Sequence, residues 1–98
     1  MFVILYDEAA EDDLRGFRAF EVRRILDEVE AQLVREPMQP TRRRKLLENL
    51  VPTWGSIGPV WQLRVGGFRV FYEVAEDQRR VIVRAIRRKG RSRTGDIL

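Results

Sequence analysis

The chain contains no cysteine and no histidine in its 98 residues. Without cysteine it has neither disulfides nor a thiolate nucleophile, and without histidine it lacks the usual general base and the usual zinc ligand. Its longest apolar run, Phe2–Tyr6, is far shorter than the roughly 20 residues of a transmembrane helix, and no signal peptide is recognisable. We therefore expect no metal site, no cofactor and no membrane partner, and a soluble protein of the cytoplasm.

Length and charge bound the class of protein. A chain of 98 residues suits one domain, residues 1–98, of modest stability. Its charge is uneven, because residues 1–36 carry a net charge of −5 and residues 37–98 one of +9. This asymmetry predicts an acidic helical layer and a basic surface that faces a polyanion, for which nucleic acid is the first candidate. The alternative is that the charges only keep a small domain in solution.

The first third of the chain predicts one strand and two helices. The continuous apolar run Phe2–Tyr6 is typical of a strand buried within a sheet. Asp7 precedes a segment with acids in its first turns, where they favour the helix dipole. A longer helix is predicted from about Ala19 to Arg35. Its core-facing stripe consists of Val22, Ile25, Leu26, Val29 and Leu33.

A long connection follows, because all four prolines fall between residues 37 and 59. Within it, the segment 41–50 predicts a short helical turn whose leucines pack inward and whose cations project outward. These cations are either a solvated patch or a contact to nucleic acid, and the sequence leaves both readings open. They are Arg42, Arg43, Arg44 and Lys45.

The segment Trp61–Val74, WQLRVGGFRVFYEV, predicts a β-hairpin around Gly66-Gly67. A two-residue glycine turn of the primed type is a favoured hairpin connection. Counting outward from this turn places Arg64 directly opposite Arg69. Like charges that face each other destabilise a sheet by roughly 0.2 to 1 kcal/mol, and an anionic ligand would relieve that repulsion.

A second hairpin is predicted around a polar turn at residues 76–79, with a last strand over 80–86. This register pairs Val70 with Ala85 and gives the sheet one apolar face for the helices. The opposite face then carries Gln62 and places Arg84 opposite Phe71, diagonal to Arg69. Three guanidinium groups around one aromatic ring are typical of a phosphate-binding surface with a stacking platform. An ordinary solvated sheet face is the alternative, and a shift of one residue would undo the grouping.

A second basic cluster follows the last strand and extends the positive surface beyond the sheet. Each phosphate that such cations contact would make the affinity fall with added salt. The cluster consists of Arg87, Arg88, Lys89, Arg91 and Arg93.

Taken together, WQLRVGGFRVFYEV, the preceding TRRRKLL and the terminal RRKGR resemble the RelE/ParE superfamily of bacterial type II toxins. The resemblance covers nearly the whole chain. It implies an α+β fold in which two N-terminal helices pack on a curved antiparallel sheet of about four strands. It also implies a cognate antitoxin whose acidic or amphipathic segments mask the basic surface.

The resemblance implies more than one function. RelE-like members cut messenger RNA on the ribosome with the ribose 2′-OH as nucleophile, whereas ParE-like members inhibit DNA gyrase. By position, Arg69 and Lys89 match residues that hold the scissile phosphate in RelE-like nucleases. The chain departs from that pattern at Val60 and Gln62, which replace lysines, and at Gly95, which replaces a tyrosine.

The remaining chemistry rests on the cations. Arg64, Arg69 and Arg84 are the candidates for stabilising a phosphorane. The proton acceptor is left open among the titratable groups predicted near the basic face, which are Lys45, Glu73 and Lys89. We expect a ribosome-dependent endoribonuclease, with a gyrase inhibitor and a non-catalytic RNA-binding toxin as the alternatives.

Overall fold

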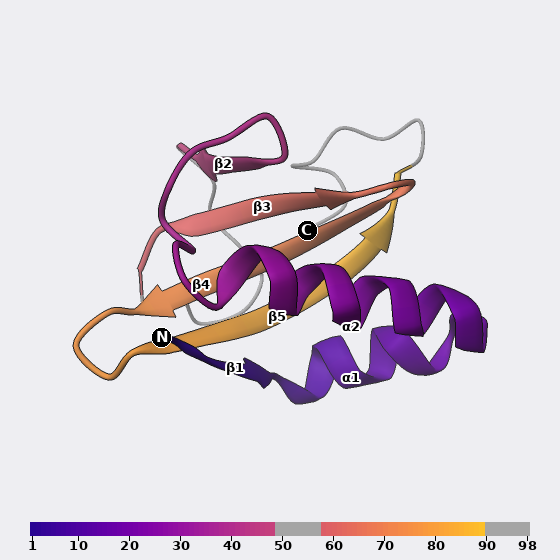
Figure 1. The fold of residues 1–98 in the computed structure, drawn as a ribbon. Coiled ribbons are helices and arrows are strands. Elements are labelled where there is room, and N and C mark those ends of the chain that lie inside the picture. The colour runs from indigo at the N-terminus through magenta and orange to yellow at the C-terminus, as the bar shows by residue number, and fades with distance from the viewer. Residues whose placement is uncertain (49–57, 90–98) are drawn as a thin grey trace.

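The computed structural model describes residues 1–48 and 58–89 of the chain (Figure 1). The predictions made for Arg91, Arg93 and Gly95 lie outside these residues. None of the helices in the described part is long and apolar enough to cross a membrane. In chain order the elements are β1 (Val3–Tyr6), α1 (Glu8–Arg15), α2 (Ala19–Leu33), β2 (Arg44–Leu47), β3 (Val60–Val65), β4 (Phe68–Ala75) and β5 (Arg80–Arg88).

The strands form one five-stranded sheet in the order β1-β5-β4-β3-β2. β1 runs parallel to β5, and the other neighbours are antiparallel. Figure 1 shows α1 and α2 side by side on one face of this sheet. The predicted α+β fold with two N-terminal helices is confirmed, but the sheet is mixed and has one strand more than the expected four.

β1 occupies an edge of the sheet, so the prediction that its apolar run lies buried is wrong. The side chain of Val3 is 59% exposed and that of Leu5 is 41% exposed. An edge strand has a neighbour on one side only, and the helices cover one face of the sheet. Alternate β1 residues therefore face solvent, whereas Phe2, just before the strand, is buried.

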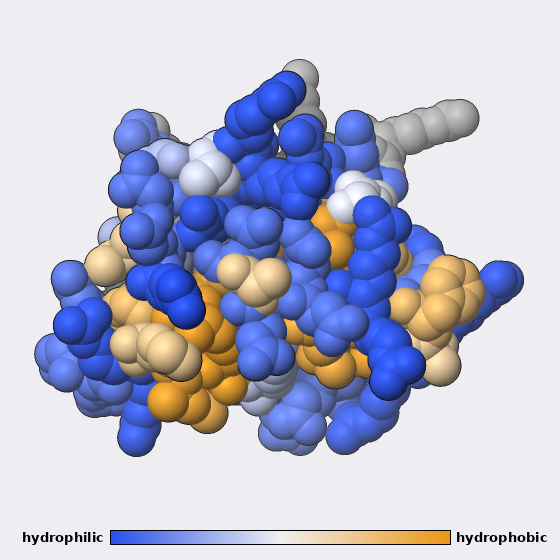
Figure 2. Space-filling view, viewed as in Figure 1, coloured by the Kyte–Doolittle hydropathy of each residue, from blue (hydrophilic) through white to orange (hydrophobic). Residues whose placement is uncertain are grey.

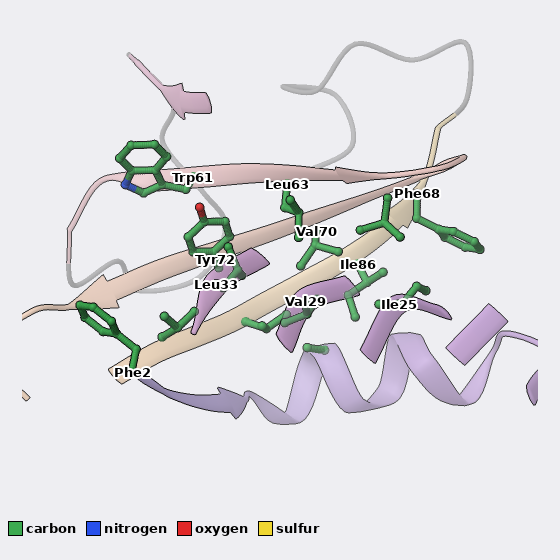
Figure 3. Packing of buried hydrophobic residues seen from close by; sticks show 14 residues of the cluster. Phe2, Ile25, Val29, Leu33, Trp61, Leu63, Phe68, Val70, Tyr72 and Ile86 are labelled. Carbon is green, nitrogen blue, oxygen red and sulfur yellow. The ribbon is translucent and has the colours of Figure 1, made fainter. Parts of the chain in front are cut away.

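The core lies between the sheet and the helices, as Figure 3 shows. α2 contributes Ile25, Val29 and Leu33, which are fully buried. They recur at helical spacing and confirm that this face of α2 packs on the sheet. The stripe is narrower than predicted, because Val22 is only partly buried and Leu26 is 37% exposed.

The segment predicted as a helical turn contains β2, which pairs antiparallel with β3. Strand pairing alternates the side chains, so the four cations do not all project outward. Arg44 is buried, and its Nη1 donates hydrogen bonds to the carbonyl oxygens of Gln32 and Glu36. A cation is favourable at a helix C-terminus, where carbonyls lack partners within the helix. Arg44 thus ties β2 to the end of α2, and the prediction that it projects outward toward RNA is wrong.

β5 contains a bulge opposite the Phe71/Tyr72 junction. Tyr72 pairs with Val83 as predicted, but Phe71 pairs with Ala85, so Arg84 is the extra residue. Beyond the bulge every side chain changes face. Val70 therefore pairs with Ile86 rather than with Ala85, and Ile86 joins the helix-facing core (Figure 3).

We expect Arg44→Leu to lower the free energy of unfolding by about 1.5 to 3 kcal/mol, because hydrogen bonds from a buried charged group would be lost. Arg42→Leu is the matched control, since Arg42 is exposed in the same arginine run. Urea unfolding followed by circular dichroism measures both. Equal losses for the two variants would contradict the assigned role of Arg44.

Candidate nucleic-acid interface

The β3–β4 hairpin has the predicted register, with Arg64 opposite Arg69. Gly66 has φ +54°, and it is the only described glycine with a positive φ. A positive φ at the first turn residue alone is the pattern of a type II′ hairpin turn, which suits the twist of the strands. The turn therefore fixes the two arginines as cross-strand neighbours.

Both arginines of this pair lack a carboxylate within 4 Å among residues 1–48 and 58–89. Arg69 donates from Nη1 to the carbonyl oxygen of Phe68 at 3.0 Å, and Arg64 donates from Nη2 to that of Arg42 at 3.4 Å. Burial, and then the charge of Arg64, lower the pKa of Arg69 from its ordinary value. The pair is thus a concentration of positive charge without an internal counterion in the described part of the chain.

The predicted grouping of three guanidiniums around the Phe71 ring is wrong. Phe71 is fully buried in a small cluster with Val60 and Ala85, so it offers no stacking platform. Arg84 lies at the bulge, where its Nε is 3.5 Å from a carboxylate oxygen of Glu73 and 3.6 Å from one of Asp7. The bulge shifts the strand by one residue, and Arg84 becomes a structural ion-pair partner instead of a neighbour of the arginine pair.

Arg87 takes the place opposite Arg69 that the predicted register gave to Ile86. The row Arg64–Arg69–Arg87 crosses three strands, but Arg87 donates to a carboxylate oxygen of Asp13 in α1. The same oxygen of Asp13 accepts the backbone N–H of Ile86 at 2.9 Å. Asp13 therefore satisfies a strand donor and neutralises one cation of the row.

Arg88 is also held within the chain. Its guanidinium donates to both carboxylate oxygens of Glu21, at 2.8 and 2.9 Å, and lies over the rings of Phe17 and Phe68. The hydrogen bond from Arg88 lowers the pKa of Glu21. Acidic residues of the helices thus neutralise cations of β5, and Figure 2 shows hydrophilic side chains over most of this helix-bearing face.

Of the other residues predicted to contact RNA, some are exposed and some are engaged in contacts within the chain. Lys45 is exposed and pairs across the ladder with Gln62, which is buried. Arg43 donates to Glu28 at 2.9 Å. The backbone N–H of Lys89 donates to the carbonyl of Gly67 at 2.7 Å and places Lys89 beside the hairpin turn.

One cation near the turn, Arg24, was not among the predicted site residues. Arg24 of α2 lies against Gly66, so close that a Cβ there would stand 2.7 to 2.9 Å from the guanidinium atoms. The residues are 42 positions apart, and no local pattern links them. Only the packing of α2 on the sheet brings them together.

Two groups that could move a proton, Glu73 and Tyr72, are fully buried rather than exposed beside the arginine pair. Glu73 is fully buried and accepts a hydrogen bond from the backbone N–H of Gly58. Tyr72 is buried and donates to the carbonyl of Pro37 at 2.5 Å. Burial raises the pKa of Tyr72, and burial together with the charge of Glu30 raises the pKa of Tyr6 to about 12.

A sequence model described as the ParE toxin of the type II toxin-antitoxin system parDE matches residues 4–93. The chain belongs to the ParE toxin family. It is therefore a type II toxin of the RelE/ParE superfamily, as the sequence analysis expected. A comparison with curated proteins found no match.

Solved structures share the fold of this ParE-family toxin at low sequence identity. The Mycobacterium tuberculosis RelBE2 toxin-antitoxin complex contains a chain with TM-score 0.68 and 17% identity, covering 89% of this chain and 96% of that one. The archaeal RelE-RelB complex of Pyrococcus horikoshii contains a chain with TM-score 0.64 and 19% identity, covering 93% of this chain and 98% of that one. The isolated Escherichia coli RelE toxin has TM-score 0.60 and 14% identity, covering 99% of this chain and 94% of that one. At these identities the likeness shows the fold alone.

The buried ion pair of the ParE-family toxin predicts that Arg84 supports the fold. We expect Arg84→Leu to lower the free energy of unfolding by about 3 to 5 kcal/mol, because it leaves the charge of Glu73 buried. Replacing both Arg84 and Glu73 by leucine should restore part of this loss. The control is Arg80→Leu on the same strand, an exposed site that should change stability by less than about 0.5 kcal/mol. A loss for Arg84→Leu no larger than that of the control would contradict the prediction.

The two tyrosines predict how stability depends on alkaline pH. Their folded-state pKa values are raised, so the neutral side chains contribute stability that is complete below the unfolded pKa of about 10. This contribution falls as the pH rises from about 10 toward about 12. Tyrosinate absorbance should therefore increase together with loss of the circular dichroism signal, whereas the urea-unfolded chain should titrate near pH 10. Tyrosinate formation near pH 10 in a protein that stays folded would contradict it.

Proposed function

We propose that this toxin is an endoribonuclease that cuts messenger RNA on the ribosome. The observation that carries the proposal is the Arg64–Arg69 pair, two adjacent guanidiniums without a carboxylate within 4 Å in the described residues. Guanidinium forks match the oxygens of a phosphate group. A bound phosphodiester would supply the negative charge that the pair lacks.

The chemistry that fits this pair is the attack of a ribose 2′-OH on the adjacent phosphodiester. A bond forms between the 2′ oxygen and phosphorus, the bond from phosphorus to the 5′ oxygen breaks, and the 5′ oxygen takes up a proton while the 2′-OH gives one to water. The negative charge on the phosphorane grows between these events. Arg64 and Arg69 would stabilise that charge, and the ribosome would hold the message in place.

The proposal includes an antitoxin and a site of action. RelE toxins of M. tuberculosis and P. horikoshii were solved in complex with their antitoxin partners. We propose that a cognate antitoxin places an acidic or amphipathic segment over the Arg64–Arg69 pair of this chain. The toxin then acts in the cytoplasm, on ribosomes and messenger RNA, once the antitoxin is removed.

Inhibition of DNA gyrase is the second candidate. It is favoured by the family description and by the full burial of Glu73 and Tyr72, two groups that could otherwise accept the 2′-OH proton. A gyrase inhibitor needs no proton acceptor. In that case the acidic α1–α2 pair, rather than the arginines of the sheet, would contact the target.

The test is induction of the toxin in bacteria, with sequencing of message 5′ ends on ribosomes and a parallel assay for gyrase-dependent DNA breaks. We expect wild type to cut messages and Arg69→Ala to reduce cutting by about 100-fold or more, because one stabilising donor of this kind contributes that much. Arg69→Lys should keep part of the activity, since it retains the charge without the planar fork.

The matched control is Arg80→Ala, which removes one positive charge at the far end of the sheet and should leave cutting unchanged. Each variant must keep the thermal unfolding midpoint of wild type within a few degrees. Undiminished cutting by Arg69→Ala would overturn the site. DNA breaks without message cutting would establish the gyrase reading, and ribosome binding with neither outcome would identify a non-catalytic RNA-binding toxin.

A further inference from the structure

A polar hollow of about 410 Å³ lies beside the tip of the β3–β4 hairpin. Figure 1 shows this tip at the right, on the same side as the N-terminal half of α2. The hollow is built from three parts of the chain that are distant in sequence: α2, the residue before β2, and the end of β3 with its turn. It is lined by Arg24, Glu28, Arg43, Arg64, Val65 and Gly66.

The charges that line the hollow do not balance. Three guanidiniums meet one carboxylate, so the formal charge of the lining is +2. Glu28 is already engaged, because its Oε1 accepts hydrogen bonds from Arg43 at 2.9 Å and from the side chain of Gln32 at 3.1 Å. Arg24 and Arg64 have no carboxylate within 4 Å in the described ranges. The hollow therefore carries more positive charge than its single carboxylate can balance.

Gly66 allows Arg24 to take this position. The guanidinium atoms of Arg24 lie 2.7 to 2.9 Å from the place where a Cβ of residue 66 would stand, and the φ of +54° also favours glycine. At Gly67 the same construction meets no atom within 4 Å. A side chain at residue 66, but not at residue 67, would push Arg24 out of the hollow.

Arg64 belongs both to this hollow and to the pair with Arg69. An anion in the hollow and a phosphate at the pair would therefore be neighbours, joined through one shared arginine. Successive phosphates of a single nucleic-acid strand provide such neighbouring anions. Guanidiniums bind phosphate oxygens, like carboxylate oxygens, with two parallel hydrogen bonds. A phosphodiester backbone presents one such anion at every nucleotide and therefore suits two adjacent sites.

We propose that the Arg24–Arg43–Arg64 hollow binds a second backbone phosphate of the RNA strand, adjacent to the phosphate held by Arg64 and Arg69. The assignment to RNA rests on the proposed function, whereas the affinity for a phosphate group rests on the hollow itself. Arg24 is then a residue that positions the strand across the hairpin tip. It takes no part in breaking the bond.

The test measures binding without cleavage, using the full chain and a short single-stranded RNA with 2′-O-methyl groups. Fluorescence anisotropy at several salt concentrations gives the affinity and its salt dependence. We expect Arg24→Gln to weaken binding by about tenfold and to reduce the salt slope by about one, as the loss of one phosphate contact does. Arg23→Gln is the matched control: it removes the same charge from the same helix outside the hollow, and we expect less than a twofold change.

A second pair of variants tests the geometry. Gly66→Ala should weaken RNA binding as Arg24→Gln does, whereas Gly67→Ala should leave it unchanged. In wild type, inorganic phosphate should shift the side-chain Nε resonances of Arg24 and Arg64 in NMR spectra, and Arg24→Gln should reduce the shift at Arg64. These spectra also verify that each variant is folded.

The outcomes separate this inference from the proposed function. Equal affinities of Arg24→Gln and Arg23→Gln for RNA would overturn the second phosphate site, even if cutting still depends on Arg69. An Arg24-dependent loss of RNA affinity supports the site, even if no message is cut. If an Asp- and Glu-rich peptide binds in an Arg24-dependent way and RNA does not, the hollow is a protein-docking site and the RNA assignment is overturned.

Discussion

The two-residue turn at Gly66 and Gly67 is the constraint on which the arrangement of cations depends. A positive φ at Gly66 closes the hairpin in one register, and that register sets Arg64 opposite Arg69. The missing side chain of Gly66 also admits the guanidinium of Arg24. One backbone feature thus holds together charges from two strands and a helix, although each of them repels the others.

The remaining cations show why this repulsion does not unfold a small domain. The acidic helices supply counterions to β5, with Asp13 bound to Arg87 and Glu21 bound to Arg88. Glu73, inside the sheet, pairs with Arg84. Carboxylates therefore neutralise these cations of β5 but not those at the tip of the β3–β4 hairpin in the described residues. This arrangement leaves net positive charge at the hairpin tip, where an anionic ligand would gain most from binding.

The predicted and observed pairings of β5 differ because of a single bulged residue. Alternation along the strand correctly paired Tyr72 with Val83, since nothing disturbs the ladder from the turn to that point. The bulge at Arg84 then shifted the remaining residues of β5, which buried Ile86 under the helices and set Arg87 opposite Arg69. A bulge depends on how well two particular registers satisfy the core on both faces, and the alternation of one strand does not contain that information. The predicted exposed grouping of Arg84 with Phe71 was therefore wrong, because Arg84 pairs with Glu73 and Phe71 is buried.

The sequence by itself determined the two N-terminal helices, most of the apolar stripe of α2 and the register of the β3–β4 hairpin, because each follows from interactions between residues close in the chain. Charge asymmetry likewise indicated a basic surface. Tertiary structure decided that β1 lies at an edge, that the arginine-rich segment pairs with β3 as β2, and which cations have partners. These outcomes depend on contacts between distant segments, whose energies are comparable and whose geometry is set only when the whole sheet and its helices pack together.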